Sequence, residues 1–198
     1  MKRLFALLLV FSLAVLPASA LEDVAEGSWY AQAVDYVLEQ GLMSPSGGRF
    51  RPNAAASRGM VVTVLWRLAG APEAEEPASF SDVSPDSWYA QAAAWGHAQG
   101  IVAGSGGAFR GDQPVTREQL AVFLLRYCRF AGLEVAQGPL SAYADAETVS
   151  AWAEEGMAHA VGAGLITGTS GFRLDPKGST TRAQLAVILR RLTTPAVG

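Results

Sequence analysis

The sequence predicts an all-α protein made of three copies of one helix–loop–helix unit. Residues 29–33 and 88–92 are identical, Trp-Tyr-Ala-Gln-Ala, and Trp152 marks a third occurrence. Each of these segments is followed by a Gly-rich loop and then by a helix start with an apolar stripe behind it. Self-similarity at a regular spacing is typical of repeat architectures. We therefore treat the chain as three units.

Five landmarks set the register of the three copies. The offset between the first and second copies is 59 residues at each landmark, and the offset between the second and third varies from 63 to 65. Small insertions between Asp145 and Trp152 and after Phe172 explain the variation. We expect the phenylalanines of the series to lie in the core. The landmarks are Asp23/Asp82/Asp145, Trp29/Trp88/Trp152, Gly41/Gly100/Gly164, Phe50/Phe109/Phe172 and Arg58/Arg117/Arg182.

The first helix of the unit is predicted over about residues 87–99 in the second copy. Trp88, Ala92 and Trp95 fall on one helical face. Gly100 follows as a C′ residue, because glycine accepts the left-handed conformation that ends a helix. Since each repeated tryptophan begins an apolar stripe, we expect core packing for these rings, with exposure to a ligand as the alternative.

The second helix of the unit begins at a capping signature. Thr116 and Gln119 predict a capping box, as do Thr181 and Gln184. Ser57 can cap the first copy, but Met60 cannot return the bond. Apolar stripes follow in each copy: Val61, Val64, Leu65 and Leu68; Leu120, Phe123, Leu124 and Tyr127; Leu185, Ile188, Leu189 and Leu192.

The three units are expected to form one domain. A unit of about 60 residues is marginally stable alone, so each stripe must be covered. The simplest arrangement packs the three second helices together with the first helices outside. This gives a pseudo-threefold spindle around a central three-helix bundle, without a sizeable β-sheet.

Composition divides the chain into a leader, three repeats and two linkers. Residues 1–20 have the charged, apolar and small-residue order of a secretory signal peptide, and the run is too short to span a membrane. Repeats are expected over residues 21–70, 80–132 and 143–192, with linkers at 71–79 and 133–142 and a tail at 193–198. No later segment is apolar enough to span a membrane.

Charge and composition exclude several functions. Net charge −3 gives no electrostatic footprint for a nucleic acid. One Cys and two distant His make a metal centre improbable. We expect neither a metal nor a cofactor. Glu75–Glu76 and Glu154–Glu155 are adjacent pairs rather than carboxylates facing each other across a cleft, so a glycosidase is not expected.

The repeated motifs resemble the S-layer homology repeat. The order Asp-Val, Trp-Tyr-Ala, Gly-Ile, Gly-rich turn, Phe and Thr-Arg-Glu-Gln runs through residues 80–126, and the third copy repeats it with Thr-Thr-Arg-Ala-Gln. The resemblance covers essentially the whole chain after residue 20. It implies a spindle of helices that binds secondary cell-wall polysaccharide, often capped by a pyruvylated amino sugar. It also implies a secreted protein held at the cell wall, in the S-layer.

The resemblance also implies which residues contact the glycan. The family signature is Thr-Arg-Ala-Glu, and its Arg contacts the acidic glycan. Arg58, Arg117 and Arg182 hold this position, but Met60, Gln119 and Gln184 replace the final acid. The first copy departs furthest, with Gly59 at its helix start and Pro45 where the second copy has Gly104. These departures indicate a first groove that is not fully functional.

The chemistry of these residue types agrees with an anionic sugar. A helix N-terminus and an Arg both favour a carboxylate, Gly lets backbone amides approach, and an aromatic ring can stack on a sugar face. Each residue also has a structural alternative: ion pairing for Arg, loop orientation for Asp, turn geometry for Gly and core packing for Trp. The candidate glycan-binding residues are Arg58, Arg117, Arg182, Asp82, Asp145, Trp88, Trp152, Gly104, Ser105, Gly168 and Thr169.

Two functions follow as hypotheses. The first is non-catalytic attachment to the cell wall through polysaccharide bound in grooves between repeats. The second is a structural S-layer or adaptor protein that acts through contacts with other surface proteins.

Overall fold

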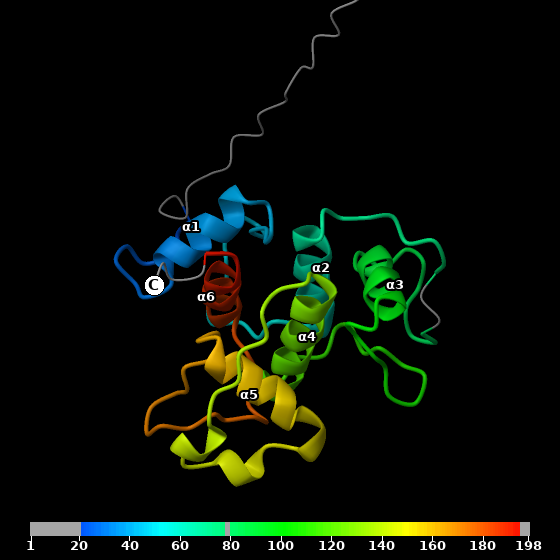
Figure 1. Cartoon of the computed structure of the whole chain (residues 1–198). Coiled ribbons are helices and arrows are strands. Elements are labelled where there is room, and N and C mark those ends of the chain that lie inside the picture. Colours follow the sequence, from blue (N-terminus) through cyan, green and yellow to red (C-terminus); the bar gives the residue numbers. More distant parts are fainter. Residues whose placement is uncertain (1–20, 78–79, 195–198) are drawn as a thin grey trace, which may run out of the picture.

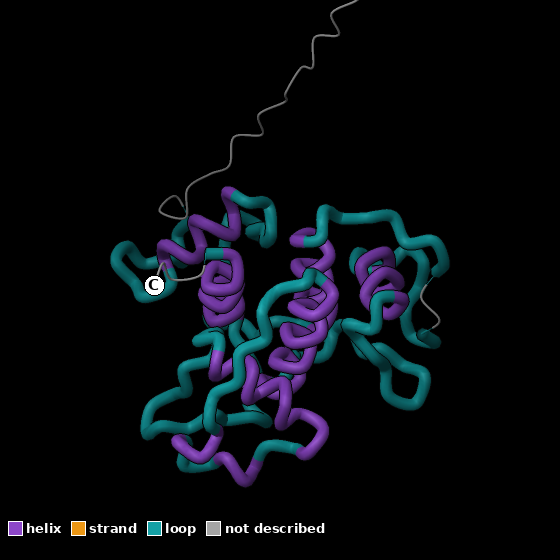
Figure 2. Tube along the Cα trace, in the orientation of Figure 1, coloured by secondary structure: helices purple, strands orange, loops and turns teal. Residues whose placement is uncertain are grey.

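The computed structural model describes residues 21–77 and 80–194, and these residues form an all-α fold (Figures 1 and 2). Six α-helices and three short 3-10 helices are present, and this part of the chain contains isolated β-bridges in place of strands. The predicted all-α class is confirmed. The predicted signal peptide lies outside the described residues.

The first helix of each repeat is short and ends at a glycine. These helices are α1 (Ala31–Glu39), α3 (Ala90–Ala98) and α5 (Glu154–Gly162), with 3-10 turns η2 (Leu140–Ala142), η3 (Ala146–Thr148) and η4 (Ala151–Ala153) before the last. Gly41, Gly100 and Gly164 all have φ between +64° and +68°. This conformation confirms the predicted C′ positions. Helix α3 begins three residues later than expected, because Ser87 and Ala90 take part in turns before it.

The second helix of each repeat begins at a capped arginine. These helices are α2 (Arg58–Leu68), α4 (Arg117–Phe130) and α6 (Arg182–Thr193). Complete capping boxes form at Thr116 and Thr181, while Ser57 accepts one bond, from the Met60 amide. All three predictions about these caps are confirmed.

The helices pair between repeats rather than within them. Helix α3 packs on α2, α5 packs on α4, and α1 packs on α6. Each first helix therefore lies against the second helix of the preceding repeat, and the first repeat closes onto the last. Figure 1 shows α1, α3 and α5 at the outside. Of the second helices, α2 and α4 contact each other directly; the pseudo-threefold spindle stays a prediction.

A closed ring of backbone hydrogen bonds joins the segments that precede the second helices. The Ala56 amide donates to the Thr180 carbonyl (2.8 Å), the Thr180 amide to the Val115 carbonyl (3.0 Å), and the Val115 amide to the Ala56 carbonyl (2.9 Å). All three residues are fully buried. Each repeat thus donates to one neighbour and accepts from the other.

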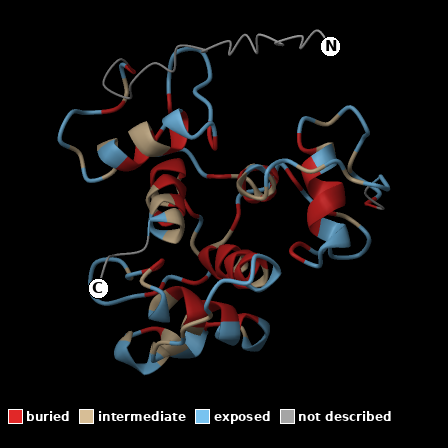
Figure 3. Ribbon diagram, turned by 45° about the horizontal axis from the view of Figure 1, so that its top comes forward, coloured by how far each residue is buried: buried red, intermediate tan, exposed pale blue. Residues whose placement is uncertain are grey.

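The apolar stripes face the interior, as predicted. Figure 3 shows buried residues along the inner faces of the helices. Leu65, Leu124 and Leu189 are fully buried, and the remaining stripe residues are buried or partly buried. No helix in residues 21–77 or 80–194 has the length and hydropathy needed to cross a membrane.

The core position of the third repeat is occupied by Leu174 and not by Phe172. Phe50 and Phe109 are fully buried as expected, but 79% of Phe172 is exposed. The reason is a longer loop: Ser105 bridges to Ala108, whereas Thr169 bridges to Arg173. The extra residue in this loop shifts the register, so that Leu174 and not Phe172 reaches the core. The expectation for Phe172 was wrong.

Candidate functional site

The three motif arginines lie between repeats. Each is the first residue of its helix, and its Nε donates to a backbone carbonyl of the following repeat. Arg58 donates to Phe109 (2.9 Å), Arg117 to Leu174 (2.6 Å) and Arg182 to Phe50 (2.6 Å). The last of these bonds closes the cycle. The arginines therefore hold neighbouring repeats together, in addition to any contact with a ligand.

The motif arginines differ in exposure and in electrostatic surroundings. Arg117 and Arg182 are 5% and 8% exposed, while Arg58 is only partly buried. Burial lowers the pKa of all three guanidiniums, and the charge of Arg110 lowers the pKa of Arg58 further. Asp175 and Asp145 act in the opposite sense and raise the pKa of Arg117. Arginine stays charged, so these shifts describe how burial and neighbouring charges act on each guanidinium and do not indicate a change of protonation.

Aromatic rings hold two of the guanidiniums in place. The Arg58 Cζ lies 5.0 Å from the centroid of the Phe109 ring and 5.1 Å from that of Phe123. The Arg182 Cζ lies 4.7 Å from the centroid of the Phe50 ring. Cation–π contacts at these distances are attractive and limit the rotamers of the side chain.

The repeated aspartates orient the loops that the arginines contact. Both carboxylate oxygens of Asp82 accept backbone amides, from Phe109 and Arg110 (2.7 Å each). Asp145 accepts in the same way from Leu174 (2.7 Å) and Asp175 (2.9 Å). Burial alone would raise the pKa of each carboxyl, but the amide donors outweigh it and lower the pKa. The geometry favours the loop-orienting role for both residues.

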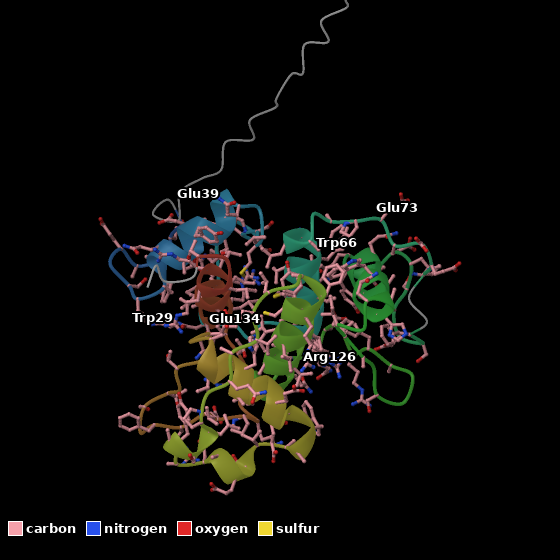
Figure 4. The ribbon with its side chains drawn as sticks, in the orientation of Figure 1. Trp29, Glu39, Trp66, Glu73, Arg126 and Glu134 are labelled. Atoms are coloured by element: carbon pink, nitrogen blue, oxygen red, sulfur yellow. The ribbon has the colours of Figure 1, made fainter. Side chains whose placement is uncertain are left out.

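The repeated tryptophans are exposed, and the expected core packing is wrong. Trp29, Trp88 and Trp152 are 67%, 60% and 58% exposed. Trp29 lies at the outer edge of the molecule, below α1 (Figure 4). Trp88 precedes α3 instead of beginning it, and the adjacent Tyr89 enters the core in its place, with the two rings edge to face at 5.1 Å. Their exposure leaves all three rings accessible to a ligand, which was the alternative to core packing.

The largest groove combines parts of all three repeats. It has a volume of about 760 Å³ and we call it the Arg58 groove. Its wall includes Arg58 from the first repeat, Gly104 and Ser105 from the second and Trp152 from the third. The structure therefore brings four of the predicted site residues to one place.

Two smaller grooves have the same composition in cyclic order. The Arg117 groove, of about 450 Å³, is lined by Arg117, Gly168, Thr169 and Trp29. The Arg182 groove, of about 360 Å³, is lined by Arg182, Ser44, Pro45 and Trp88, together with Met60. Asp82 and Asp145 line none of the three grooves. Pro45 and Met60, the departures of the first repeat, thus belong to the Arg182 groove and not to the Arg58 groove.

The loop glycines are required by close packing. A Cβ on Gly104 would lie 2.6 Å from the Ala108 carbonyl oxygen, and a Cβ on Gly168 would lie 2.8 Å from Tyr143. The Ser105 amide donates to Ala108, and the Thr169 hydroxyl donates to the Arg173 carbonyl. The geometry of the turn is therefore enough to account for these residue types. The same loops form one wall of the Arg58 groove and of the Arg117 groove.

A second repeated arginine was missed in the sequence. Arg67, Arg126 and Arg191 recur at offsets of 59 and 65 residues, the same offsets as the motif arginines. These equal offsets could have revealed the second series from the sequence. Arg126 lines the Arg58 groove, Arg67 the Arg182 groove and Arg191 the Arg117 groove. Each groove therefore contains two repeated guanidiniums.

Comparison with known families identifies the repeat. The family described as S-layer homology domain matches residues 21–59, 79–121 and 142–186, which together make up more than half of the chain. The chain belongs to the S-layer homology domain family. The three matches follow the three repeats found in the sequence, so S-layer homology repeats account for the cyclic arrangement described above.

Relatives of the chain include surface-layer proteins. It is similar to the surface-layer 125 kDa protein of Lysinibacillus sphaericus, with 32% identity over 183 residues, and to an S-layer protein of Bacillus thuringiensis subsp. finitimus, with 25% over 171 residues. These alignments cover 89% and 85% of the chain but 15% and 21% of the relatives. An amylopullulanase of Thermoanaerobacterium thermosulfurigenes shares 28% over 142 residues, 71% of the chain and 8% of the relative. The family and the surface-layer relatives support anchoring at the cell surface.

Proposed function

We propose that the chain is a non-catalytic module that is secreted to the bacterial cell wall and binds secondary cell-wall polysaccharide there. The observation that carries the proposal is the composition of the grooves. Each one joins an arginine, a loop of small residues and an exposed tryptophan drawn from three different repeats. A terminal pyruvyl ketal, which presents a carboxylate on a sugar, fits this combination.

The chemistry of the grooves suits an acidic sugar. A guanidinium offers a planar donor fork that matches a carboxylate, and the permanent charge keeps it a donor at any physiological pH. The exposed indole offers an apolar face to the ring of the sugar. Net charge −3 does not prevent such binding, because the cations are collected in the grooves.

Binding without hydrolysis is supported by the lining of the grooves. Hydrolysis of a glycosidic bond commonly needs two carboxyl groups about 5–10 Å apart. No Asp or Glu lines the three grooves. We infer that the module holds the glycan and does not cut it.

A structural role in an S-layer is the second candidate, favoured by the surface-layer relatives. It would act through contacts between proteins, and the exposed Phe172 is the most prominent apolar side chain outside the grooves. Sedimentation velocity across a concentration series distinguishes the two. Self-association without glycan favours the structural role, whereas a monomer at every concentration argues against it.

Sedimentation with purified wall sacculi tests the binding proposal. We expect the protein to pellet with intact sacculi and to stay in solution after the secondary polysaccharide is extracted. Replacing Trp29, Trp88 and Trp152 together by Ala should abolish pelleting. Phe172→Ala is the control, because Phe172 is more exposed than any of these tryptophans but lies outside the grooves. Equal binding to intact and extracted walls would contradict the proposal.

A further inference from the structure

The three grooves differ in how many of their guanidinium groups are available to a ligand. Each groove contains one motif arginine and one arginine from the second repeated series. The difference lies in what those side chains already bind within the protein.

In the Arg182 groove both guanidiniums already donate hydrogen bonds within the protein. Arg182 donates from Nη2 to the Ser44 carbonyl (3.0 Å) and from Nη1 to the Met60 Sδ (3.4 Å), in addition to its bond to Phe50. Arg67 donates to the carbonyl of Leu42 (2.9 Å). Arg182 thus uses three of its five N–H groups within the protein, more than either of the other motif arginines.

In the Arg117 groove two aspartates offset the positive charge of Arg117. Arg117 is 5% exposed and lies in the field of Asp145 and Asp175. Asp175 is equivalent to Arg51 and Arg110 of the other repeats. The backbone amide of each of these three residues donates to the aspartate of its own repeat. Arg191 donates to the carbonyls of Gly164 and Leu165, at 3.3 Å each.

In the Arg58 groove three cations meet, and at Arg58 the repulsion from Arg110 outweighs the attraction of Asp82. Arg58, Arg110 and Arg126 line the cavity, and its lining includes no Asp or Glu. Arg58 donates from Nη2 to the Ala103 carbonyl (3.0 Å), as Arg182 does to Ser44, but its Nη1 makes no such bond to a sulfur, and Arg58 is the most accessible of the motif arginines. Arg126, a residue of α4 that is labelled in Figure 4, is half-buried and makes no hydrogen bond or ion pair with the residues that the structure describes. Like charges gathered in a groove attract an anion, because a bound anion removes their mutual repulsion.

We propose that the Arg58 groove is the primary glycan site of the chain and that it takes a glycan segment with two carboxylates, one at Arg58 and one at Arg126. Trp152 covers the sugar between them. This inference rests on the proposed function, because it assumes that the grooves bind acidic glycan. It reverses the expectation from the sequence, in which the first copy was the impaired one.

Isothermal titration calorimetry with two synthetic probes tests the second carboxylate. The first probe is an amino sugar with one pyruvyl ketal, and the second is a disaccharide that adds a uronic acid next to it. The unmodified protein should bind the second probe at least about tenfold more tightly, the effect expected of one additional charge-assisted hydrogen bond. Arg126→Gln should remove that advantage and leave the affinity for the first probe within about twofold.

Matched controls come from the same helix position in the other repeats. Arg67→Gln and Arg191→Gln remove the same charge from the other two grooves and should leave the preference for the second probe in place, because that preference belongs to the Arg58 groove. If all three variants weaken binding equally, the grooves are equivalent and the inference is wrong. If Arg126→Gln weakens both probes equally, Arg126 does not hold the second carboxylate.

Indole NMR signals report occupancy without depending on a charge variant. The Trp152 indole N–H, assigned with Trp152→Phe, should shift at the lowest concentrations of the second probe, before those of Trp29 and Trp88. Simultaneous shifts of the three signals would overturn the assignment of a primary groove while the proposed function stands. If the protein binds neither probe nor intact sacculi, the proposed function itself fails.

Discussion

The guanidinium of Arg117 donates to the backbone carbonyl of Leu174, 2.6 Å away and 57 residues along the chain. Both residues are buried, and the bond crosses from the second repeat to the third. The motif arginine is thus part of the framework of the domain. A binding experiment that removes this side chain also removes a bond between repeats, and the two effects must be separated.

Arg117→Ala should lower the free energy of unfolding by about 1.5–3 kcal/mol, because the variant leaves a buried carbonyl unpaired. Arg126→Ala is the matched control. It removes the same charge from the same helix, and since Arg126 has no partner among the described residues, its effect should stay within about 0.5 kcal/mol. Urea unfolding at fixed pH measures both. Equal effects would show that the Arg117 bond contributes nothing specific.

Asp145→Asn should destabilise the protein at neutral pH and matter less in acid. Burial opposes ionisation of Asp145, but two backbone amides and Arg173 bring its pKa below the ordinary value of 3.8. A carboxyl with a lowered folded-state pKa stabilises the fold above its unfolded pKa, and this stabilisation is lost as the pH falls through the folded value. The melting temperatures of wild type and variant should therefore differ at pH 6 and converge as the pH falls below 3.8. A constant difference would exclude this linkage.

Leu174→Ala and Phe172→Ala should differ strongly in stability. Leu174 is fully buried, so its truncation should cost about 2–5 kcal/mol. Phe172 is 79% exposed, and its truncation should change the free energy of unfolding by less than about 0.5 kcal/mol. Guanidinium unfolding of the two variants checks the register of the third repeat. The opposite order would restore Phe172 to the core.

Gly59→Ala should destabilise the protein although alanine favours helices. The added Cβ would lie 2.8 Å from Tyr89 Cδ1 and 3.1 Å from the Gly111 carbonyl oxygen. The steric conflict outweighs a helix-propensity gain of at most about 1 kcal/mol. Met60→Gln, in the same turn, is the control. It can complete the missing capping box and should be neutral or stabilising by up to about 1 kcal/mol in thermal unfolding. A gain in stability for Gly59→Ala would contradict the close packing seen here.

Local signals in the sequence predicted the helices well. The capping boxes at Thr116 and Thr181 and the C′ glycine at Gly100 depend on residues within one turn of each other, so the local sequence determines them. Tryptophan exposure was predicted incorrectly because Trp88 lies before α3, where helical periodicity no longer applies. The position of Leu174 was missed because one extra residue between Thr169 and Arg173 shifts the register.

The composition of the grooves could not be derived from a single repeat. Periodicity describes which residues share a face of one helix, whereas Arg58, Gly104 and Trp152 come from three different copies. Their meeting depends on the pairing of each first helix with the preceding repeat, a long-range property of the fold. The sequence therefore supplied the correct residue types for the candidate site and could not show which of them meet.

The closed ring formed by Ala56, Val115 and Thr180 has a consequence for how such chains gain and lose length. In a stacked array each copy touches only its neighbours, so copies can be added or deleted singly. Here, deletion of the third copy would leave the buried Ala56 amide without an acceptor and the Val115 carbonyl without a donor. The same deletion would take one component from every groove, a different one each time. The ring and the grooves therefore need all three repeats. A duplication or deletion in the gene keeps this arrangement intact only when it includes the three copies together.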